Sequence, residues 1–457
     1  MPIEESTYEY LQDLIDKQKW TEVAKLLSEM HTADIAEVIN TSPSNIHKTL
    51  FNILPQDAKP DVLAELEDIA ETDIIESLTD DELSDIIEEM SPDDAADIIG
   101  ELTEERSEEV LNLMEDEDSE DVRKLLRYKD DTAGGIMTTD VVAMLGNQTV
   151  QEAINEIAYI DEEEPFFFAY IVDKDHKLIG YMDLWELVRT KNRTQELINI
   201  AHTDMISVDV DTDQEEVARK FSKYDLKAIP VVDSENVLVG RITSDDVIDV
   251  IEEEASEDIF KLAGSNDDEI ESVSPFTSCK LRLPWLFLTL IGGFFTSYIL
   301  NKFNILVSRQ AIILVAFVPI ILGMGGNTGL QSSTLVVRSI ALGRFKNKNI
   351  IKHIQKEMLT GVMMGLICGV CIAGWAFLII GQTPAAISTY KLAAVVGLAL
   401  CSAMTFATLF GATVPILLDK IKIDPAIASG PFISSANDIS ALLIYFGVTT
   451  SLLNIIM

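Results

Sequence analysis

The segment PFISSANDISALLIYFG, residues 431–447, places one carboxylate, Asp438, directly before an uncharged run from Ile439 to Met457. A run of this length is typical of a helix that crosses a bilayer. A carboxylate is costly at membrane depth, so intramembrane acids usually face a bundle interior or a water-filled path. No Lys or Arg lies in this final run to neutralise the charge. Asp438 is therefore a candidate cation ligand.

A second segment with polar groups, PIILGMGGNTGLQSST, occupies residues 319–334. It carries Asn327, Gln331 and Thr334 among glycines, which we predict to loosen the helix around Asn327. We also predict that the helix is interrupted before Asp438, at Pro425, Gly430 and Pro431. Hydrophobic segments that are broken by Gly or Pro and carry polar groups are the expected signature of an ion site. Close helix packing also favours glycine, but it does not explain the amides.

The donor atoms indicate a hard cation, because carboxylates, hydroxyls, amides and carbonyls all offer oxygen. A single carboxylate per subunit is too little for a calcium cage. Mg²⁺ keeps several of its waters and needs only one or two protein carboxylates. The residues alone leave Mn²⁺, Co²⁺, Na⁺ and a proton open.

Charge divides the chain into two parts. Residues 276–457 hold 4 acids and 13 bases, a balance of +9, whereas residues 1–275 hold 72 acids and 21 bases, a balance of −51. So many acids exclude nucleic-acid binding, which requires Lys and Arg, and they attract cations. The N-terminal sequence has no signal peptide pattern, so the acidic part is expected to remain cytosolic.

Uncharged runs predict five membrane spans, and the third is expected to end near residues 381–384. The runs are 283–301, 311–337, 358–390, 392–418 and 439–457. Starting inside, the cytosolic connections hold ten Lys and Arg and the external ones hold three. This asymmetry predicts a multi-pass protein of the cytoplasmic membrane with its soluble domains in the cytosol and its C-terminus outside.

Three regions are expected before the spans. Residues 1–131 alternate Ile, Leu and Val with acids at helical spacing, with a start signal at Ser91-Pro92, and predict a superhelical stack of short helices. Residues 132–252 contain a repeat: IVDKDHKLIGYMDLWELV matches VVDSENVLVGRITSDDVI at an offset of sixty residues. Such a repeat indicates two copies of one fold. Residues 253–275 continue as an acidic connecting helix.

The two copies, at about 132–195 and 196–252, resemble a tandem pair of CBS domains, a regulatory α/β module that often binds adenine nucleotides. With the acidic helical domain, a connecting plug helix and a five-helix transmembrane domain at 276–457, the chain resembles the MgtE family of magnesium channels. The resemblance implies a homodimer with its pore between the subunits and Asp438 as the principal Mg²⁺ ligand. The expected pore residues are Asp438, Asn327, Gln331, Thr334 and Ser434, the last through its backbone carbonyl. At Gly430 the chain has no side chain where family members can place a polar group.

The resemblance also implies that cytosolic Mg²⁺ binds between the acidic domain, the CBS pair and the plug helix and closes the pore. Crowded acids repel one another, and divalent ions between them reverse that repulsion, so a compact state binds Mg²⁺ better. Lys223 and Lys227 are expected to neutralise part of this acidic set. The candidate regulatory ligands are Asp93, Asp94, Asp97, Asp211, Asp213, Asp246, Asp249, Glu254, Glu257 and Asp258.

Other function classes fit less well. A proton- or Na⁺-coupled divalent cation exchanger that uses Asp438 as its carrier remains open. A chloride channel disagrees with a pore carboxylate and an acidic cytosolic part. An enzyme is not expected, because no nucleophile, general-base pair or Walker loop is present. ATP is a possible modulator through the CBS pair, although no Gly-rich phosphate loop is found.

Overall fold

The computed structural model describes residues 5–160, 166–265, 275–306, 312–343, 350–380, 388–428 and 430–456. The chain divides into two compact units, Met1–Ile251 and Glu252–Met457. Helix α14, Ser244–Ala263, is continuous across the boundary and so belongs to both units. Several residues used to predict membrane orientation, such as Arg309 and Arg344, lie outside the described residues, as do residues 266–274 of the connecting region and the expected break at 381–384.

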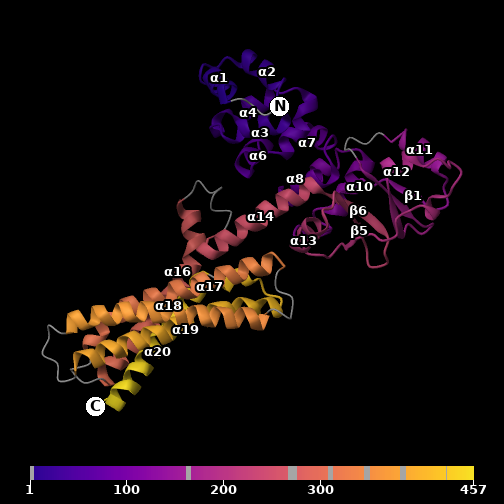
Figure 1. Ribbon diagram of the computed structural model, residues 1–457. Helices are drawn as coiled ribbons and strands as arrows, with labels where there is room; N and C mark the ends of the chain where they lie inside the picture. The colour runs from indigo at the N-terminus through magenta and orange to yellow at the C-terminus, as the bar shows by residue number, and fades with distance from the viewer. Residues whose placement is uncertain are drawn as a thin grey trace. The chain divides into compact units, whose positions relative to one another are not determined.

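The first part of the first unit is a series of short helices joined by tight turns (Figure 1). Acids follow the start of most of them, where they complement the helix dipole. At α7 Thr79 and Glu82 form a capping box, and at α8 Ser91 accepts a hydrogen bond from the amide of Asp94, as the start signal predicts. The helices are α1 Glu5–Asp16, α2 Trp20–Leu27, α3 Thr32–Asn40, α4 Ser44–Asn52, η1 Gln56–Ala58, α5 Lys59–Ala64, α6 Asp68–Ile75, α7 Asp80–Ile87, α8 Pro92–Glu101, α9 Glu104–Leu111 and α10 Asp116–Leu125.

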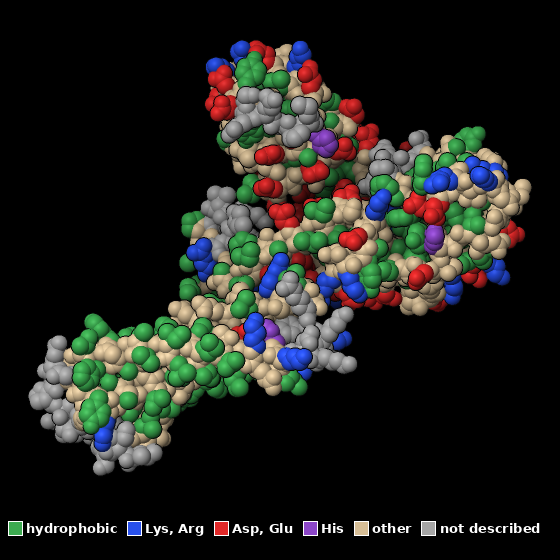
Figure 2. All heavy atoms as spheres, viewed as in Figure 1, with side chains coloured by type: hydrophobic (Ala, Val, Ile, Leu, Met, Phe, Trp, Pro, Cys, Tyr) green, Lys and Arg blue, Asp and Glu red, His purple; other side chains and the backbone are tan. Residues whose placement is uncertain are grey.

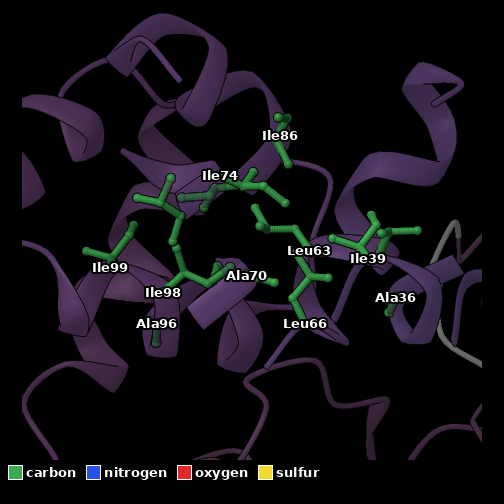
Figure 3. Close-up of a cluster of buried hydrophobic side chains, with 14 of the residues drawn as sticks. Ala36, Ile39, Leu63, Leu66, Ala70, Ile74, Ile86, Ala96, Ile98 and Ile99 are labelled. Atoms are coloured by element: carbon green, nitrogen blue, oxygen red, sulfur yellow. The ribbon is translucent and has the colours of Figure 1, made fainter. Parts of the chain in front are cut away.

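The buried side chains of these helices are aliphatic and meet in one continuous core. Figure 3 shows Leu63, Ile74, Ile86 and Ile98, from four different helices, pointing toward one another. The same core continues into the second CBS-like copy, for example to Val231. The helical region and that copy therefore share apolar burial within the first unit.

The repeat at an offset of sixty residues is confirmed by the sheet register. In the first copy β2 pairs parallel with β1 and antiparallel with β3, and β5 has the same relation to β4 and β6 in the second copy. Both copies follow the expected β-α-β-β-α order. The first copy has β1 Ala143–Leu145, α11 Val150–Ile157, β2 Phe168–Val172, β3 Leu178–Asp183, α12 Leu184–Arg189 and η2 Leu197–Asn199, and the second has β4 Val208–Asp209, α13 Gln214–Tyr224, β5 Ala228–Val232, β6 Leu238–Thr243 and α14.

The two copies meet through an exchange of backbone hydrogen bonds at equivalent positions. The amide of Leu178 donates to the carbonyl of Asn236, and the amide of Leu238 donates to the carbonyl of His176. His176 and Asn236 both have positive φ, 57° and 65°, which places the same tight turn at the contact in each copy. The contact is thus nearly symmetric, as expected for a tandem pair.

The second unit contains long apolar helices. Within the described residues, five helices are long and apolar enough to cross a membrane, as predicted. Hydrophobic side chains cover the surface of this unit, whereas acidic side chains gather over the short helices of the first (Figure 2). The elements are α16 Pro275–Leu306, η3 Ile312–Phe317, α17 Val318–Ala341, α18 Ile350–Ile380, α19 Thr389–Lys420, η4 Pro425–Ala428 and α20 Pro431–Ile456.

Helix α19 is the centre of the membrane unit, because α17, α18 and α20 all pack against it. Small residues allow close approach: a Cβ on Gly369 would lie 2.7 Å from the carbonyl oxygen of Gly397 in α19. Helix α16 packs on α20, where a Cβ on Gly292 would lie 2.9 Å from Cβ of Ser435. In lipid the hydrophobic effect does not drive helices together, so membrane helices associate largely through close packing, which small residues allow.

Two predictions about the membrane helices are wrong. Helix α17 runs without interruption through Asn327, so its glycines do not loosen it. The last helix begins at Pro431, because Pro is well suited to a first helical position, and Asp438 therefore lies inside α20, about two turns from its start.

Helix α6 offers a matched test of the helical core. Ile74 is fully buried and Ile69, on the same helix, is 38% exposed. Replacing Ile74 by Ala should lower the free energy of unfolding of the first unit by about 2–5 kcal/mol, because it leaves a cavity. Ile69→Ala should change it by less than about 0.5 kcal/mol. Urea-dependent proteolysis of the full chain measures both, and equal losses would contradict this core.

Candidate functional site

Asp438 and Ser434 lie one turn apart on α20, on the face that meets α17 at Gly326. A Cβ on Gly326 would lie 3.3 Å from Asp438 Oδ1 and 3.6 Å from Ser434 Oγ. Asp438 is half-buried, and within the described residues it has no hydrogen bond or ion pair. The Ser434 carbonyl lies inside a regular helix, where it accepts from residue 438, so its hydroxyl is the better placed group.

The three polar residues predicted from the second segment form one stripe on α17. Asn327, Gln331 and Thr334 follow at helical spacing and all three are exposed in the single chain. The opposite face of α17, with Gly329 and Val336, is buried. An exposed polar stripe on a membrane helix is unfavourable against lipid, which indicates that water or another protein surface covers it.

The glycines of α17 are explained by packing and not by loosening. A Cβ on Gly329 would overlap the Asn437 amide, and a Cβ on Gly411 of α19 would overlap the carbonyl oxygen of Gly329. A Cβ on Gly325 would lie 2.9 Å from Cβ of Ala441. Three helices therefore meet at Gly329, which contacts Asn437, the residue before Asp438.

Asn437 is fully buried, and neither of its amide atoms has a hydrogen-bond partner among the described residues. Its position beside Gly329 fixes the rotation of α20. Since Asp438 is the next residue, that rotation directs its carboxylate away from the packed core and toward Gly326.

The end of α14 contacts the segment before α20, within the second unit. Lys261 Nζ lies 2.7 Å from Asp424 Oδ2 and also pairs with Glu257. Asp424 Oδ1 in turn accepts from the amide of Ala426 at 2.8 Å. A Cβ on Gly430 would lie 2.5 Å from the Leu262 carbonyl oxygen, so this position is in contact with the connecting helix.

Four of the predicted regulatory acids come together in the first unit, on α8 and the start of α14. Burial and then the charge of the neighbouring Asp94 raise the pKa of Asp93 to about 6. Burial and then the charge of Asp93 raise the pKa of Asp246 to about 6, although Thr243 donates to it from its amide and hydroxyl. Partial desolvation and then the charge of Asp93 also raise the pKa of Asp97, although the residue is exposed to solvent. These four residues form an acidic cluster in which the charged form of the carboxyl groups is disfavoured.

The other predicted ligands are not brought into this cluster by any described contact. Asp213 caps α13 by accepting from the amide of Glu215, and Asp211 and Asp249 are exposed. Glu254, Glu257 and Asp258 are half-buried and belong to the second unit, where Glu257 pairs with Lys261. Among the described residues, no three acidic, His or Cys side chains are arranged so as to hold a metal ion.

Lys223 and Lys227 each contact an aromatic ring. Lys223 lies over the ring of Tyr224 at 4.2 Å and Lys227 over that of Phe167 at 4.9 Å. Lys227 also lines a pocket between the two CBS-like copies. Its lining residues are Phe167, Phe168, Tyr170, Lys227, Ala228, Arg241, Thr243, Ser244 and Asp245.

Comparison with known families covers most of the chain. Residues 318–448 match the model of the divalent cation transporter MgtE, residues 30–131 match the MgtE intracellular N domain, and residues 197–253 match the CBS domain. The magnesium transporter MgtE of Enterococcus faecalis is 38% identical over 326 residues, which is 71% of this chain and 70% of that protein.

This chain belongs to the MgtE family. The MgtE protein of Thermus thermophilus is 36% identical over 72% of this chain and 71% of its own length. A solved structure, the cytosolic domain of the Mg²⁺ channel MgtE in complex with ATP, is 31% identical, covers 53% of this chain and 99% of that chain, and has a TM-score of 0.49.

Membership of the MgtE family confirms the resemblance stated from the motifs and the multidomain fold. It also confirms a membrane transporter and not an enzyme, because the family consists of divalent cation transporters. The family model of the CBS domain matches the second copy. The sheet register assigns the first copy to the same fold.

Sequence reasoning missed three charged residues of this MgtE chain. Lys261 is a base in an acidic helix and Glu357 is the one acid of α18, and both signals were visible in the sequence. Glu71 lies beside Glu101 and Asp68, and burial, followed by these charges, raises its pKa to about 8. No sequence pattern distinguished Glu71 from its many acidic neighbours.

Two glycines of α17 test the three-helix contact. Gly329→Ala forces a Cβ into the Asn437 amide, whereas nothing lies within 4 Å of a Cβ on Gly323. We expect Gly329→Ala to destabilise the membrane unit by about 1–3 kcal/mol, as overpacking does, and to lower the thermal unfolding midpoint in detergent. Gly323→Ala should leave the midpoint unchanged or slightly higher. A Gly329→Ala protein as stable as wild type would rule out this packing.

Proposed function

We propose that this protein is a Mg²⁺-selective channel for magnesium uptake across the cytoplasmic membrane, closed by cytosolic Mg²⁺. In this proposal two copies form a homodimer with the pore between them. The soluble domains and N-terminus lie in the cytosol and the C-terminus lies outside. The family and its named magnesium transporters support the transported ion.

The observation that carries the proposal is a lone intramembrane carboxylate beside an exposed polar stripe. Asp438 lies against Gly326 of α17 and has no described partner. Asn327 and Gln331 face away from the protomer on the same helix. A second copy against this face would enclose both features, so that carboxylates and amides from two subunits line one path.

Such a path fits a hydrated ion. Each subunit offers one carboxylate, the Ser434 hydroxyl and the polar groups of Asn327, Gln331 and Thr334. All are oxygen donors or amides, which suit hard cations. Mg²⁺ retains most of its water, so this sparse set is sufficient for it and too sparse to replace a Ca²⁺ coordination shell.

The acidic cluster supports regulation by internal Mg²⁺. Asp93, Asp94, Asp97 and Asp246 lie close together, and burial followed by mutual repulsion raises the pKa of Asp93, Asp97 and Asp246. We propose that Mg²⁺ is bound there and at Asp211, Asp213 and Asp249. Glu254, Glu257 and Asp258 extend the proposed set along α14.

Helix α14 is the proposed link from sensor to pore. Asp246 lies at its start in the first unit, and Lys261 near its end pairs with Asp424, seven residues before Pro431 of α20. The close contact of Leu262 with Gly430 adds a steric connection. Binding of Mg²⁺ to the acids of α14 would hold this helix end against the segment that leads to Asp438, which is the closed state.

ATP is proposed as a modulator at the pocket between the CBS-like copies. Phe167 and Tyr170 offer aromatic surface and Lys227 and Arg241 offer positive charge, the two chemistries that a nucleotide requires. Asp245 in the same lining opposes a phosphate, so nucleotide binding is expected to be aided by a cation.

Removal of the Asp438 carboxylate tests the path. Asp438→Asn and Asp438→Ala should each lower Mg²⁺ uptake into proteoliposomes by more than about 100-fold, because even groups outside the first coordination shell cost about 10–100-fold. Uptake is driven by an imposed negative-inside potential without a pH gradient. Asp419→Asn removes an exposed carboxylate of the same unit and should keep wild-type uptake.

Each outcome has a definite meaning. If both Asp438 variants conduct like Asp419→Asn, the proposed path is wrong. If wild-type uptake requires a pH or Na⁺ gradient and ignores the potential, the protein is instead the coupled exchanger, with Asp438 as its carrier.

The stability of the first unit should depend on both Mg²⁺ and pH. Carboxyls with raised folded-state pKa values bind protons better in the folded state, so stability falls as pH rises from about 4 to about 8. Without divalent ions, proteolysis of the first unit in the full chain should be faster at about pH 8 than at about pH 5.5. Saturating Mg²⁺ should remove most of this difference.

The control compares two acids of neighbouring helices. Asp97→Asn should weaken both the pH effect and the Mg²⁺ protection, whereas Asp85→Asn, at an exposed position of α7, should change neither. Proteolysis that ignores Mg²⁺ at high pH would contradict the regulatory site.

A further inference from the structure

Glu357 is a buried carboxylate that the proposed ion path does not use. It is the one acid of α18 and is only 4% exposed, about two turns into a membrane-spanning helix. A buried carboxylate in such a helix is costly unless it is hydrogen-bonded, so its presence calls for a role.

The contacts of Glu357 join two helices. Ser332 of α17 donates its hydroxyl to Glu357 Oε2 at 2.8 Å, and both residues are buried. Nε2 of His353, one turn earlier on α18, lies 3.9 Å from Oε1. Helices α17 and α18 pack mainly against α19, so this bond fixes them to each other directly.

Ser332 follows Gln331 in α17, and consecutive side chains of a helix point about 100° apart. When Ser332 is held toward α18, Gln331 is held on the exposed face with Asn327 and Thr334. The rest of the α17 packing is made by buried apolar side chains such as Ile321 and Val336 and by the close contact at Gly329, and the bond from Ser332 to Glu357 adds a directional polar contact to it. Together with that packing, the bond holds the direction of the polar stripe.

We propose that Glu357 is a positioning residue for cation binding, acting through Ser332 to fix the rotation of α17. It does not touch the ion, because it lies inside the protomer on the side of α17 opposite the stripe. The inference rests on the proposed function only in taking the stripe and Asp438 to form the ion path.

The test measures initial Mg²⁺ uptake against Mg²⁺ concentration in proteoliposomes of the full chain. Ser332→Ala and Glu357→Ala should each raise KM about tenfold, close to the effect of one lost hydrogen bond to a charged group, with the maximal rate within about twofold of wild type. Glu357→Gln keeps an oxygen that accepts from Ser332 and should restore most of the affinity. Ser333→Ala removes a buried neighbouring hydroxyl that has no described partner and should behave like wild type.

The double variant decides whether the two residues act as one unit. If the bond carries the effect, Ser332→Ala combined with Glu357→Ala should raise KM no more than either single change. Additive effects, or a Glu357→Gln protein as impaired as Glu357→Ala, would overturn the proposal. Wild-type KM in both single variants, while Asp438→Asn still abolishes uptake, would reject the positioning role and leave the path intact. If Asp438→Asn conducts, the proposed path itself is wrong.

Discussion

A carboxylate that leaves water must gain hydrogen bonds, a cation or a proton, and this constraint organises both units. Asp424 meets it with Lys261, and Glu357 meets it with Ser332 and His353. Asp438 has no hydrogen bond or ion pair among the described residues. Asp93 keeps one carboxylate oxygen, Oδ1, buried without a hydrogen-bond partner in the described part of the chain. In the proposed function, a mobile cation completes the environment of these two acids.

Close helix packing surrounds the residue that precedes Asp438. Where α17, α19 and α20 meet, glycines at positions 329 and 411 let backbones approach, and Asn437 packs against Gly329. A larger side chain at either glycine would separate the helices and let lipid or water enter between them. Residue 437, which packs against α17, thus directly precedes residue 438, the proposed ion ligand.

The sequence was sufficient for the architecture because strong local signals agreed with one another. Helical spacing of apolar residues, the offset of sixty residues and the long uncharged runs each correspond to elements in the structure. It failed at Gly325 and Gly329, since a glycine in a membrane helix can mark either a break or a contact, and only the neighbour, here Asn437, decides between them. The start of α20 at Pro431 was missed for a similar reason, because Pro both ends and begins helices.

The candidate sites were predictable to different degrees. Asp438 was conspicuous as a single charge beside an apolar run, whereas Asp93 and Glu71 are two of 72 acids in residues 1–275 and differ from the others only in burial. The pairing of Ser332 with Glu357 joins helices 25 residues apart in the chain, and no local pattern encodes such a distance.

Gly430 has a consequence for how this protein can evolve. A side chain there would meet the carbonyl oxygen of Leu262, a backbone atom that every amino acid possesses. No replacement at position 262 can therefore compensate for a larger residue at 430. A homologue with a side chain at position 430 must also have the end of α14 in a different position. The sequences of these two segments are therefore expected to change together in evolution.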